Sequence, residues 1–321
     1  MEWETQRPLV AVAVISWNTR ELLLRCLRSL AMEVDAGRAE VWVVDNGSAD
    51  GSAEAVREQA PWAHLVQTGA NLGFGAAVNL VARRSASPWL ACANADVALE
   101  PGALEALLRS GESPRVGCVA PRLLLEDGST QHSVYPLPTV PFTLTFNLGL
   151  HRVIPRLGNR LCLEGYWSSD RPRAVPWAIG AFLLLRRRAF ELVGGFDERQ
   201  WMYAEDLDLG WRLHDGGWIT RYEPDARVRH AAGASTEIAF GSERAGRFMR
   251  ETYAVLRRRR GPARTRLTAA LNVMGAAARL SWMAPLALAS GRWRSHRRES
   301  RMWLAVHWRG LRWSLAPSSR R

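Results

Sequence analysis

Short apolar runs alternate with amphipathic stretches through the first hundred residues of the chain. Residues 9–16 form a continuous, valine-rich apolar run, which is typical of a strand buried on both faces. Residues 18–32 then repeat leucine at helical spacing, and further strands are predicted at 40–44, 64–67 and 89–93. Strands that alternate with helices predict an α/β domain with a mostly parallel central sheet.

The pattern changes after residue 116. Residues 136–170 are punctuated by proline and glycine and show no clear period, so we expect a long surface excursion there. The remaining predicted elements are strands at 116–125, 131–135, 175–185, 218–222 and 227–230, a short helix at 186–193 and a helix at 242–260.

Charge divides the chain of 321 residues into two parts. The net charge is +12, yet residues 257–321 alone contain sixteen arginines and one acidic residue, Glu299. The preceding part is therefore close to neutral or mildly acidic. We expect one domain at residues 1–256 and a basic helical extension at residues 257–321.

The basic extension has the composition of a membrane-interface helix. Residues 267–290 are apolar but contain Arg279 and Pro285, which makes them a poor spanning segment. Residues 292–313 mix arginine with four tryptophans, and this pairing suits the headgroup region of a bilayer. A helix folded back on the body, or one that contacts a partner or nucleic acid, remains an alternative. No nucleic-acid motif accompanies the basic residues, so no nucleic-acid partner is expected.

The cysteines and the N-terminus predict a cytoplasmic protein. The four cysteines, Cys26, Cys92, Cys118 and Cys162, are scattered without metal-ligand spacing and are expected to be reduced and buried. The first eight residues are acidic and polar and have no secretory signal pattern.

Two aspartates follow predicted strands. Asp45 closes the strand at 40–44, and Asp96 comes after the strand at 89–93. Ligands of such sheets bind beyond the carboxyl ends of the strands. Asp45 can accept a bond from a base or a ribose hydroxyl, and Asp96 can bind Mg²⁺ or Mn²⁺. Taken singly, each aspartate is equally consistent with a turn or a helix cap.

Three acids, Glu205, Asp206 and Asp208, lie within four residues at the start of a predicted helix. The helix dipole favours acids there, and a carboxylate at the mouth of a pocket can also act as a general base. His230 ends a late predicted strand, where an imidazole usually packs or forms a hydrogen bond but can also complete a metal shell begun by Asp96. The glycine turn at 71–75 precedes a helix, whose free N–H groups can face phosphates.

Seven short motifs occur in order. They are Val-Val-Asp-Asn-Gly-Ser-x-Asp-Gly-Ser (43–52), Asn-Leu-Gly-Phe-Gly (71–75), Asn-Ala-Asp (94–96), Gly-Ala-Phe (180–182), Gly-Gly-Phe-Asp-Glu (194–198), Tyr-Ala-Glu-Asp-Leu-Asp (203–208) and His-x-x-Gly-x-Ser (230–235). Together they resemble the family 2 inverting glycosyltransferases with the Rossmann-like GT-A fold, and among these the bacterial rhamnosyltransferase-type enzymes.

The resemblance implies a role for each matching residue. Asp206 matches the catalytic base, with Glu205 and Asp208 as the next candidates. Asp96 and His230 match metal or diphosphate contacts, although Asn94 stands where the family's Asp-x-Asp motif has its first Asp. The implied nucleotide- and donor-binding residues are Ser16, Asn18, Asp45, Asn46, Asn71, Gly73, Asn94, Ala95, Gly180 and Ala181.

The resemblance also implies a reaction. It is the inverting transfer of a sugar, with dTDP-rhamnose favoured and UDP-sugars open, from a nucleotide-diphosphate donor to a lipid-linked or polysaccharide acceptor. This reaction belongs to cell-envelope glycan synthesis at the inner face of the plasma membrane. A sugar nucleotidyltransferase is disfavoured because residues 16–20 are not a glycine-rich basic loop. A non-catalytic scaffold that has kept the fold has only Asn94 in its favour.

Overall fold

The computed structural model describes residues 8–231, 244–289 and 291–315, with side chains described at 8–231, 245–282 and 296–313. The chain forms two compact units. The first contains residues up to 135 together with 168–241, and the second contains 136–167 together with 242–321.

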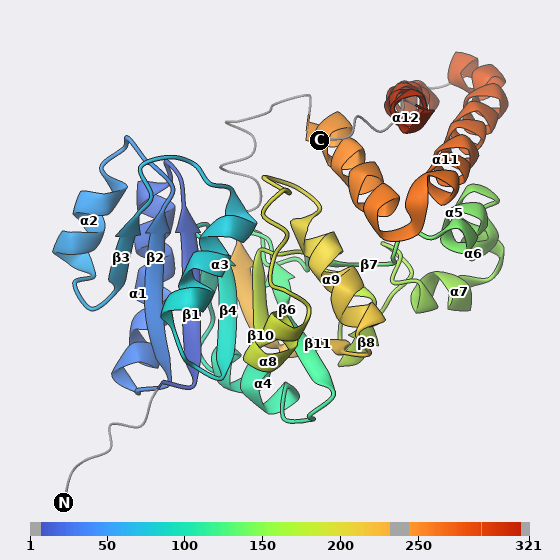
Figure 1. Cartoon of the computed structure of the whole chain (residues 1–321). Helices are drawn as coiled ribbons and strands as arrows, with labels where there is room; N and C mark the ends of the chain where they lie inside the picture. The colour runs from blue at the N-terminus through green and yellow to red at the C-terminus, as the bar shows by residue number, and fades with distance from the viewer. Residues whose placement is uncertain (1–7, 232–243, 290, 316–321) are drawn as a thin grey trace, which may run out of the picture. The chain divides into compact units, whose positions relative to one another are not determined.

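A nine-stranded mixed sheet forms the centre of the first unit, in the order β3-β2-β1-β4-β10-β6-β11-β5, with β8 beside β11 (Figure 1). The neighbours β3 (His64–Gln67), β2 (Ala39–Asp45), β1 (Val10–Ser16) and β4 (Trp89–Asn94) are all parallel. β10 (Phe182–Arg186) runs antiparallel to both β4 and β6 (Val116–Leu124), and β11 (Ile219–His230) is parallel to β6. The predicted α/β class is confirmed.

Helices cover this sheet and form the core with it. They are α1 (Arg20–Asp35), α2 (Ser52–Gln59), α3 (Phe74–Arg84), α4 (Ala103–Ser110), α8 (Arg187–Leu192) and α9 (Glu205–Asp215). Residues 10–14 of β1 are completely buried, as the valine-rich run predicts. Their valines share a core cluster with the leucines of α1, and α3 also contacts β1. The four cysteines are free and buried, which confirms the prediction.

Several strands differ from the prediction. The strand predicted at 175–185 is divided into β8 (Arg173–Val175), β9 (Trp177–Ala178) and β10 (Phe182–Arg186). The two late strands are one strand, β11, whose register against β6 shifts between Glu223 and Arg227. Pro224 lies in this shift, where it has no N–H to donate to the ladder. The strand predicted at 131–135 shortens to β7 (Val134–Tyr135), which pairs with β9 (Trp177–Ala178). β5 (Val97–Leu99) was not predicted, because three residues are too few to show a period; it and β8 (Arg173–Val175) run antiparallel to β11.

The second unit is helical. It contains α5 (Val140–Asn147), α6 (Leu150–Val153), α7 (Pro155–Arg160), α11 (Arg244–Ala289) and α12 (Gly291–Leu315), and both α5 and α12 pack on α11 (Figure 1). The surface excursion predicted at 136–170 is therefore wrong for most of its length. The helical period is hidden because α5 has apolar residues on its exposed side as well. α11 bends at Gly261, which has φ 84° and ψ 167°.

A partly buried chain of polar side chains joins three helices of this unit. Tyr253 Oη of α11 lies 3.0 Å from His307 Nδ1 of α12 and accepts a bond of 3.1 Å from Asn272 Nδ2. Asn147 Nδ2 of α5 in turn donates to Asn272 Oδ1 over 2.9 Å. Burial lowers the pKa of His307 to about 4, so this imidazole is neutral at pH 7. The basic helix α12 therefore packs against α11 by a specific contact. No helix in the described parts of the chain is long and apolar enough to cross a membrane.

Candidate active site

The carboxyl ends of the parallel strands β1, β2 and β4 lie side by side, and we call this end of the sheet the sheet edge. Ser16 lies opposite Asp45 in the ladder, and Ile15 lies opposite Asn94. Backbone bonds continue this edge past the strands, since Asn46 N donates to Ser16 O over 2.8 Å and Ala95 N donates to Ile15 O over 3.1 Å. Five predicted donor-binding residues are thereby brought together: Ser16, Asp45, Asn46, Asn94 and Ala95.

Asn18 belongs to the same cluster. It has φ 53°, its N–H donates to Ser48 Oγ over 2.9 Å, and its Oδ1 accepts from Ala49 N over 2.8 Å. These two bonds tie the loop after β1 to the loop after β2. Within the second loop, Ser48 N donates to Asp45 Oδ1 over 3.3 Å. Asp45 is buried.

The glycine turn contributes Asn71 and Gly73. Gly73 N donates to Asn71 Oδ1 over 3.0 Å, and Asn46 Nδ2 lies 3.4 Å from Gly73 O. Gly73 has φ +86°, and a Cβ there would lie 2.2 Å from Trp201 O, so only glycine fits. Trp201 Nε1 donates to Asn71 O over 3.0 Å. Sequence reasoning missed Trp201 as a site residue, because it is only one of an aromatic run before the acids.

Asp96 and His230 meet through the unpredicted strand β5. Val97 pairs with His230, and Ala231 N donates to Asp96 O over 3.0 Å. Both side chains are buried, and His230 Nε2 lies 3.4 Å from Asp96 Oδ1. The other ring nitrogen, Nδ1, lies 2.7 Å from Gln131 Oε1. Sequence reasoning missed Gln131, because one glutamine in a predicted strand carries no signal. Gly233 and Ser235 of the histidine motif lie outside the described residues.

This pair fits a divalent metal. With Gln131 Oε1 as acceptor, Nδ1 carries the proton and Nε2 presents a lone pair toward Asp96. Asp96 Oδ1 is buried and has no hydrogen-bond partner in the part of the chain that the structure describes. A buried oxygen and a nitrogen lone pair that face each other are stabilised by a cation. The described residues contain no cluster of three His, Cys, Asp or Glu side chains, so water and phosphate oxygens would supply the other ligands, as Mg²⁺ and Mn²⁺ favour.

Asp206 connects α9 to the sheet edge. Its Oδ2 accepts from Gly180 N over 2.9 Å, and its Oδ1 accepts from Leu207 N over 2.7 Å. The next residue, Ala181, accepts from Asn94 N over 2.9 Å through its carbonyl oxygen. Burial raises the pKa of Asp206, although the backbone N–H donors partly oppose this shift. A carboxylate with a raised pKa suits proton abstraction.

Backbone strain sets the start of α9. Tyr203 and Ala204 both have left-handed conformations, with φ 67° and 61°, although neither is glycine. Gln200 Nε2 donates to Tyr203 O over 2.9 Å and helps to hold this turn. Such strain clusters at functional sites and costs on the order of 1–3 kcal/mol for each residue.

The three acids of the first turn differ in their surroundings. Asp208 is completely buried, and Arg212 Nε lies 2.8 Å from its Oδ2. Arg212 Nη1 also donates to Val193 O over 2.6 Å and to Gly195 O over 2.5 Å. Through Arg212, Asp208 therefore anchors the loop before the acids. Glu205 is half-buried at the first position of α9.

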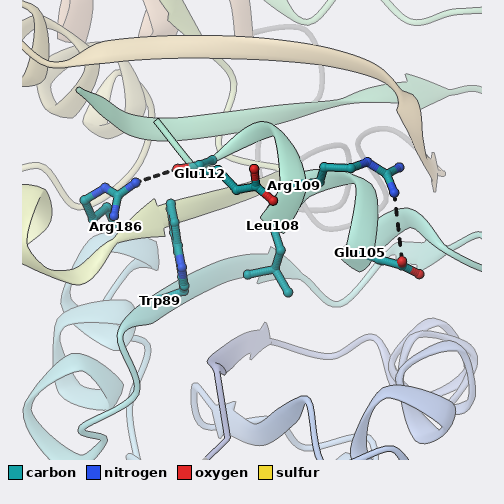
Figure 2. Close-up of a pocket in the computed structure, with 7 residues that line it drawn as sticks. Trp89, Glu105, Leu108, Arg109, Glu112 and Arg186 are labelled. Atoms are coloured by element: carbon teal, nitrogen blue, oxygen red, sulfur yellow. Dashed lines mark hydrogen bonds and ion pairs between the residues drawn. The ribbon is translucent and has the colours of Figure 1, made fainter. Parts of the chain in front are cut away.

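A separate pocket, with a volume of about 410 Å³, lies at the other end of β4 (Figure 2). Arg186 stacks over Trp89, the first residue of β4, with its guanidinium carbon 4.5 Å from the ring centroid. Arg186 also donates to Val116 O over 2.7 Å. None of the predicted site residues lines this pocket.

Comparisons with known proteins identify the family of the chain. The sequence model of glycosyl transferase family 2 matches residues 11–192, and that of glycosyl transferase family group 2 matches residues 163–315. The chain is 36% identical to the N-acetylglucosaminyl-diphospho-decaprenol L-rhamnosyltransferase of Mycobacterium tuberculosis (strain ATCC 25618 / H37Rv), over 71% of this chain and 78% of that protein. It is 29% identical to the rhamnosyltransferase WbbL of Escherichia coli (strain K12), over 52% of this chain and 61% of that protein.

Solved structures show a similar fold. The mannosyltransferase PcManGT from Pyrobaculum calidifontis, in complex with GDP-Man and Mn²⁺, has a TM-score of 0.60 at 20% identity and covers 98% of this chain and 92% of its own. The structure of GalNAc-T7 with UDP, GalNAc and Mn²⁺ has a TM-score of 0.54 at 15% identity and covers 70% of this chain and 44% of its own. From its sequence, its fold and its rhamnosyltransferase relatives, the chain belongs to glycosyl transferase family 2 and has the GT-A fold.

Proposed function

We propose that this protein is an inverting glycosyltransferase that moves a sugar from a nucleotide-diphosphate donor to an acceptor hydroxyl. One observation carries the proposal. Asp45, the Asp96–His230 pair and Asp206 come from distant parts of the chain and are connected along one sheet edge by Ser16–Asn46, Ile15–Ala95 and Asn94–Ala181 backbone bonds. Ligands bind at such edges in α/β sheets.

The donor lies along this edge in the proposed complex. Asp45 contacts the nucleoside, and the surrounding polar loops, with Ser16, Asn18, Asn46, Asn71 and Gly73, contact the nucleotide. Asp96 and His230 hold Mg²⁺ or Mn²⁺, which when bound neutralises charge on the diphosphate leaving group. Gly180 and Ala181 line the pocket for the sugar or the acceptor.

Asp206 acts as the general base. Its carboxylate takes the proton of the acceptor hydroxyl, and the hydroxyl oxygen attacks the anomeric carbon from the face opposite the diphosphate. The bond between the anomeric carbon and the diphosphate oxygen breaks, so the product has inverted configuration. The Gly180 and Leu207 N–H groups hold the carboxylate in place for this step.

The relatives suggest the substrates. Because both curated relatives described above are rhamnosyltransferases, we propose dTDP-rhamnose as the donor, with a UDP-sugar as the alternative. The decaprenol-linked substrate in the name of the mycobacterial relative suggests a lipid-linked acceptor in cell-envelope glycan synthesis. Such an acceptor would require the enzyme to work as a peripheral protein at the inner face of the plasma membrane, with the basic extension at 257–321 as one contact.

Transfer of labelled rhamnose from dTDP-rhamnose to a polyprenyl-diphosphate sugar, with the product configuration determined by NMR, tests the proposal. A product with retained configuration, or no turnover of any nucleotide sugar with metal present, contradicts it.

Metal binding gives a prediction that does not depend on turnover. We expect Mn²⁺ together with dTDP to raise the melting temperature by roughly 5–10 °C at about 100 times the dissociation constant. Asp96→Asn removes the metal-dependent part of this shift, whereas Glu54→Gln, which changes an exposed acid on α2, keeps it. Differential scanning fluorimetry with and without EDTA measures both variants. If Mn²⁺ raises the melting temperature of Asp96→Asn as much as that of the wild type, Asp96 is not a metal ligand.

Gln131 gives a second prediction, because it fixes the orientation of His230. Gln131→Leu removes the acceptor for Nδ1–H, and loss of such a partner typically costs 10–100-fold in metal affinity. We expect the Mn²⁺ concentration for half-maximal activity to rise by about this factor, with activity recovered at high Mn²⁺. Gln59→Leu, which changes an exposed glutamine at the end of α2, is the matched control. A loss of activity that Mn²⁺ does not restore would show that Gln131 has another role.

A further inference from the structure

An unusual apolar surface lies where α5 turns into α6. Within eleven consecutive residues, six large apolar side chains are exposed to solvent; these are Leu144, Phe146, Leu148, Leu150, Val153 and Ile154. Val153 is 81% exposed and Leu148 is 62% exposed. We call this surface the 144–154 patch. A concentration of exposed large apolar side chains in one short segment of a folded protein is typical of an interaction site.

The patch is a compact, locally ordered structure. The chain reverses at Gly149, which has φ 68°, and α5 contacts α6. The Phe146 ring stacks on the His151 ring at 5.3 Å between centroids. The opposite side of α5 is used inside the second unit, where Asn147 bonds to Asn272 of α11 and Thr143 is buried. α5 therefore directs polar residues inward and apolar residues outward, the reverse of the usual amphipathic arrangement.

Charge around the patch identifies its partner. Residues 128–163 contain no acidic side chain. Three arginines, Arg152, Arg156 and Arg160, are exposed on and directly after the patch. Exposed apolar side chains with arginines in and directly after the same segment complement a bilayer, whose acyl boundary accepts leucine and phenylalanine while its anionic headgroups attract arginine. The patch is short and contains a chain reversal, so it can enter the interface but cannot span the bilayer.

We propose that the 144–154 patch inserts into the interfacial layer of an anionic lipid membrane, with Arg152, Arg156 and Arg160 at the headgroups. This attachment is separate from the basic extension considered above, because it depends on apolar residues in the middle of the chain. It is independent of the proposed sugar transfer.

Vesicle binding of the full-length protein tests this proposal. The variant Leu148→Ser/Val153→Ser/Ile154→Ser changes three exposed side chains, and we expect its partitioning onto vesicles of phosphatidylcholine and phosphatidylglycerol to fall at least about tenfold. The matched control Met32→Ser/Leu192→Ser changes exposed apolar residues of the first unit and binds like the wild type. Equal melting temperatures of all three proteins show that the fold is intact.

The arginines are tested on the same vesicles. Arg152→Gln/Arg156→Gln/Arg160→Gln weakens binding to the anionic vesicles by roughly fivefold for each arginine, and much less to pure phosphatidylcholine. Wild-type vesicle binding by the triple serine variant overturns the proposal. The proposal is also overturned if the triple serine variant loses self-association but binds vesicles like the wild type. The patch would then contact a second copy of the chain. Transfer to a soluble acceptor analogue is unchanged in the serine variant, so failure here is distinct from failure of the proposed reaction.

Discussion

Asp206→Asn lowers the rate of sugar transfer by about 10²–10⁴-fold, the usual contribution of a positioned general base. The asparagine keeps the shape of the side chain and an oxygen for the Gly180 N–H, but it cannot take a proton. Donor binding therefore remains, and the loss lies in turnover. Steady-state kinetics together with dTDP binding by calorimetry measure the two effects separately.

The neighbouring acids provide the controls. Asp215→Asn changes a partly exposed acid at the end of the same helix and leaves turnover unchanged. Glu205→Gln tests the other acid of the first turn, since Asp208 is committed to Arg212. If Asp206→Asn turns over like the wild type and Glu205→Gln does not, Glu205 is the base.

The raised pKa of Asp206 also predicts how pH acts on the protein. The base works when ionised, so turnover rises with pH through the pKa of the folded state. Because burial raises this pKa above that of the unfolded chain, the folded protein binds the proton more tightly. The resulting stabilisation is complete below the unfolded pKa and is lost as pH rises through the folded one. Asp206→Asn is therefore expected to melt at a higher temperature than the wild type at pH 7–8, with the difference vanishing near pH 4. If the wild type has a higher melting temperature than Asp206→Asn at pH 8, the predicted direction of this difference is wrong.

Arg212→Met has the largest expected effect on stability. It leaves Asp208, which is completely buried, without the guanidinium 2.8 Å away. Removal of one partner of a buried ion pair costs about 3–5 kcal/mol, because the remaining charge is uncompensated. The two bonds from Arg212 to the Val193 and Gly195 carbonyl groups are lost as well. Urea denaturation measures the change in the free energy of unfolding.

Two further variants test whether the loss of stability comes from the buried ion pair. Asp208→Leu/Arg212→Met replaces both charges, and we expect it to recover much of the lost stability. Arg57→Met breaks the exposed pair with Glu54 and costs less than about 1 kcal/mol. Arg212→Met could instead lower the free energy of unfolding no more than Arg57→Met does. Solvent would then reach Asp208 after the substitution, and the Asp208–Arg212 pair would not behave as a buried ion pair.

The sequence predicted the three strands whose carboxyl ends form the candidate site, because each strand is apolar and ends in a polar residue. β1, β2 and β4 all have this form, and Asp45 and Asn94 stand at their ends for the same reason. The motif order then indicated which of these polar residues share one site.

Local pattern could not distinguish Asp206 from Asp208. Two residues apart on a helix, their side chains point to nearly opposite sides, so only the packing of α9 decides which reaches Gly180 and which is buried with Arg212. The helices at 140–160 were hidden for a related reason: α5 is apolar on its exposed side, which removes the period that identifies a helix.

By itself, the sequence determined the family, the α/β class and the strand ends that carry polar residues, since these depend on composition and spacing within short segments. Only the tertiary structure decided the contacts between distant residues: Asp96 with His230, His230 with Gln131, and Gly73 with Trp201. Each contact joins segments that are far apart in the chain. Such contacts depend on strand order and close packing, which no single segment encodes.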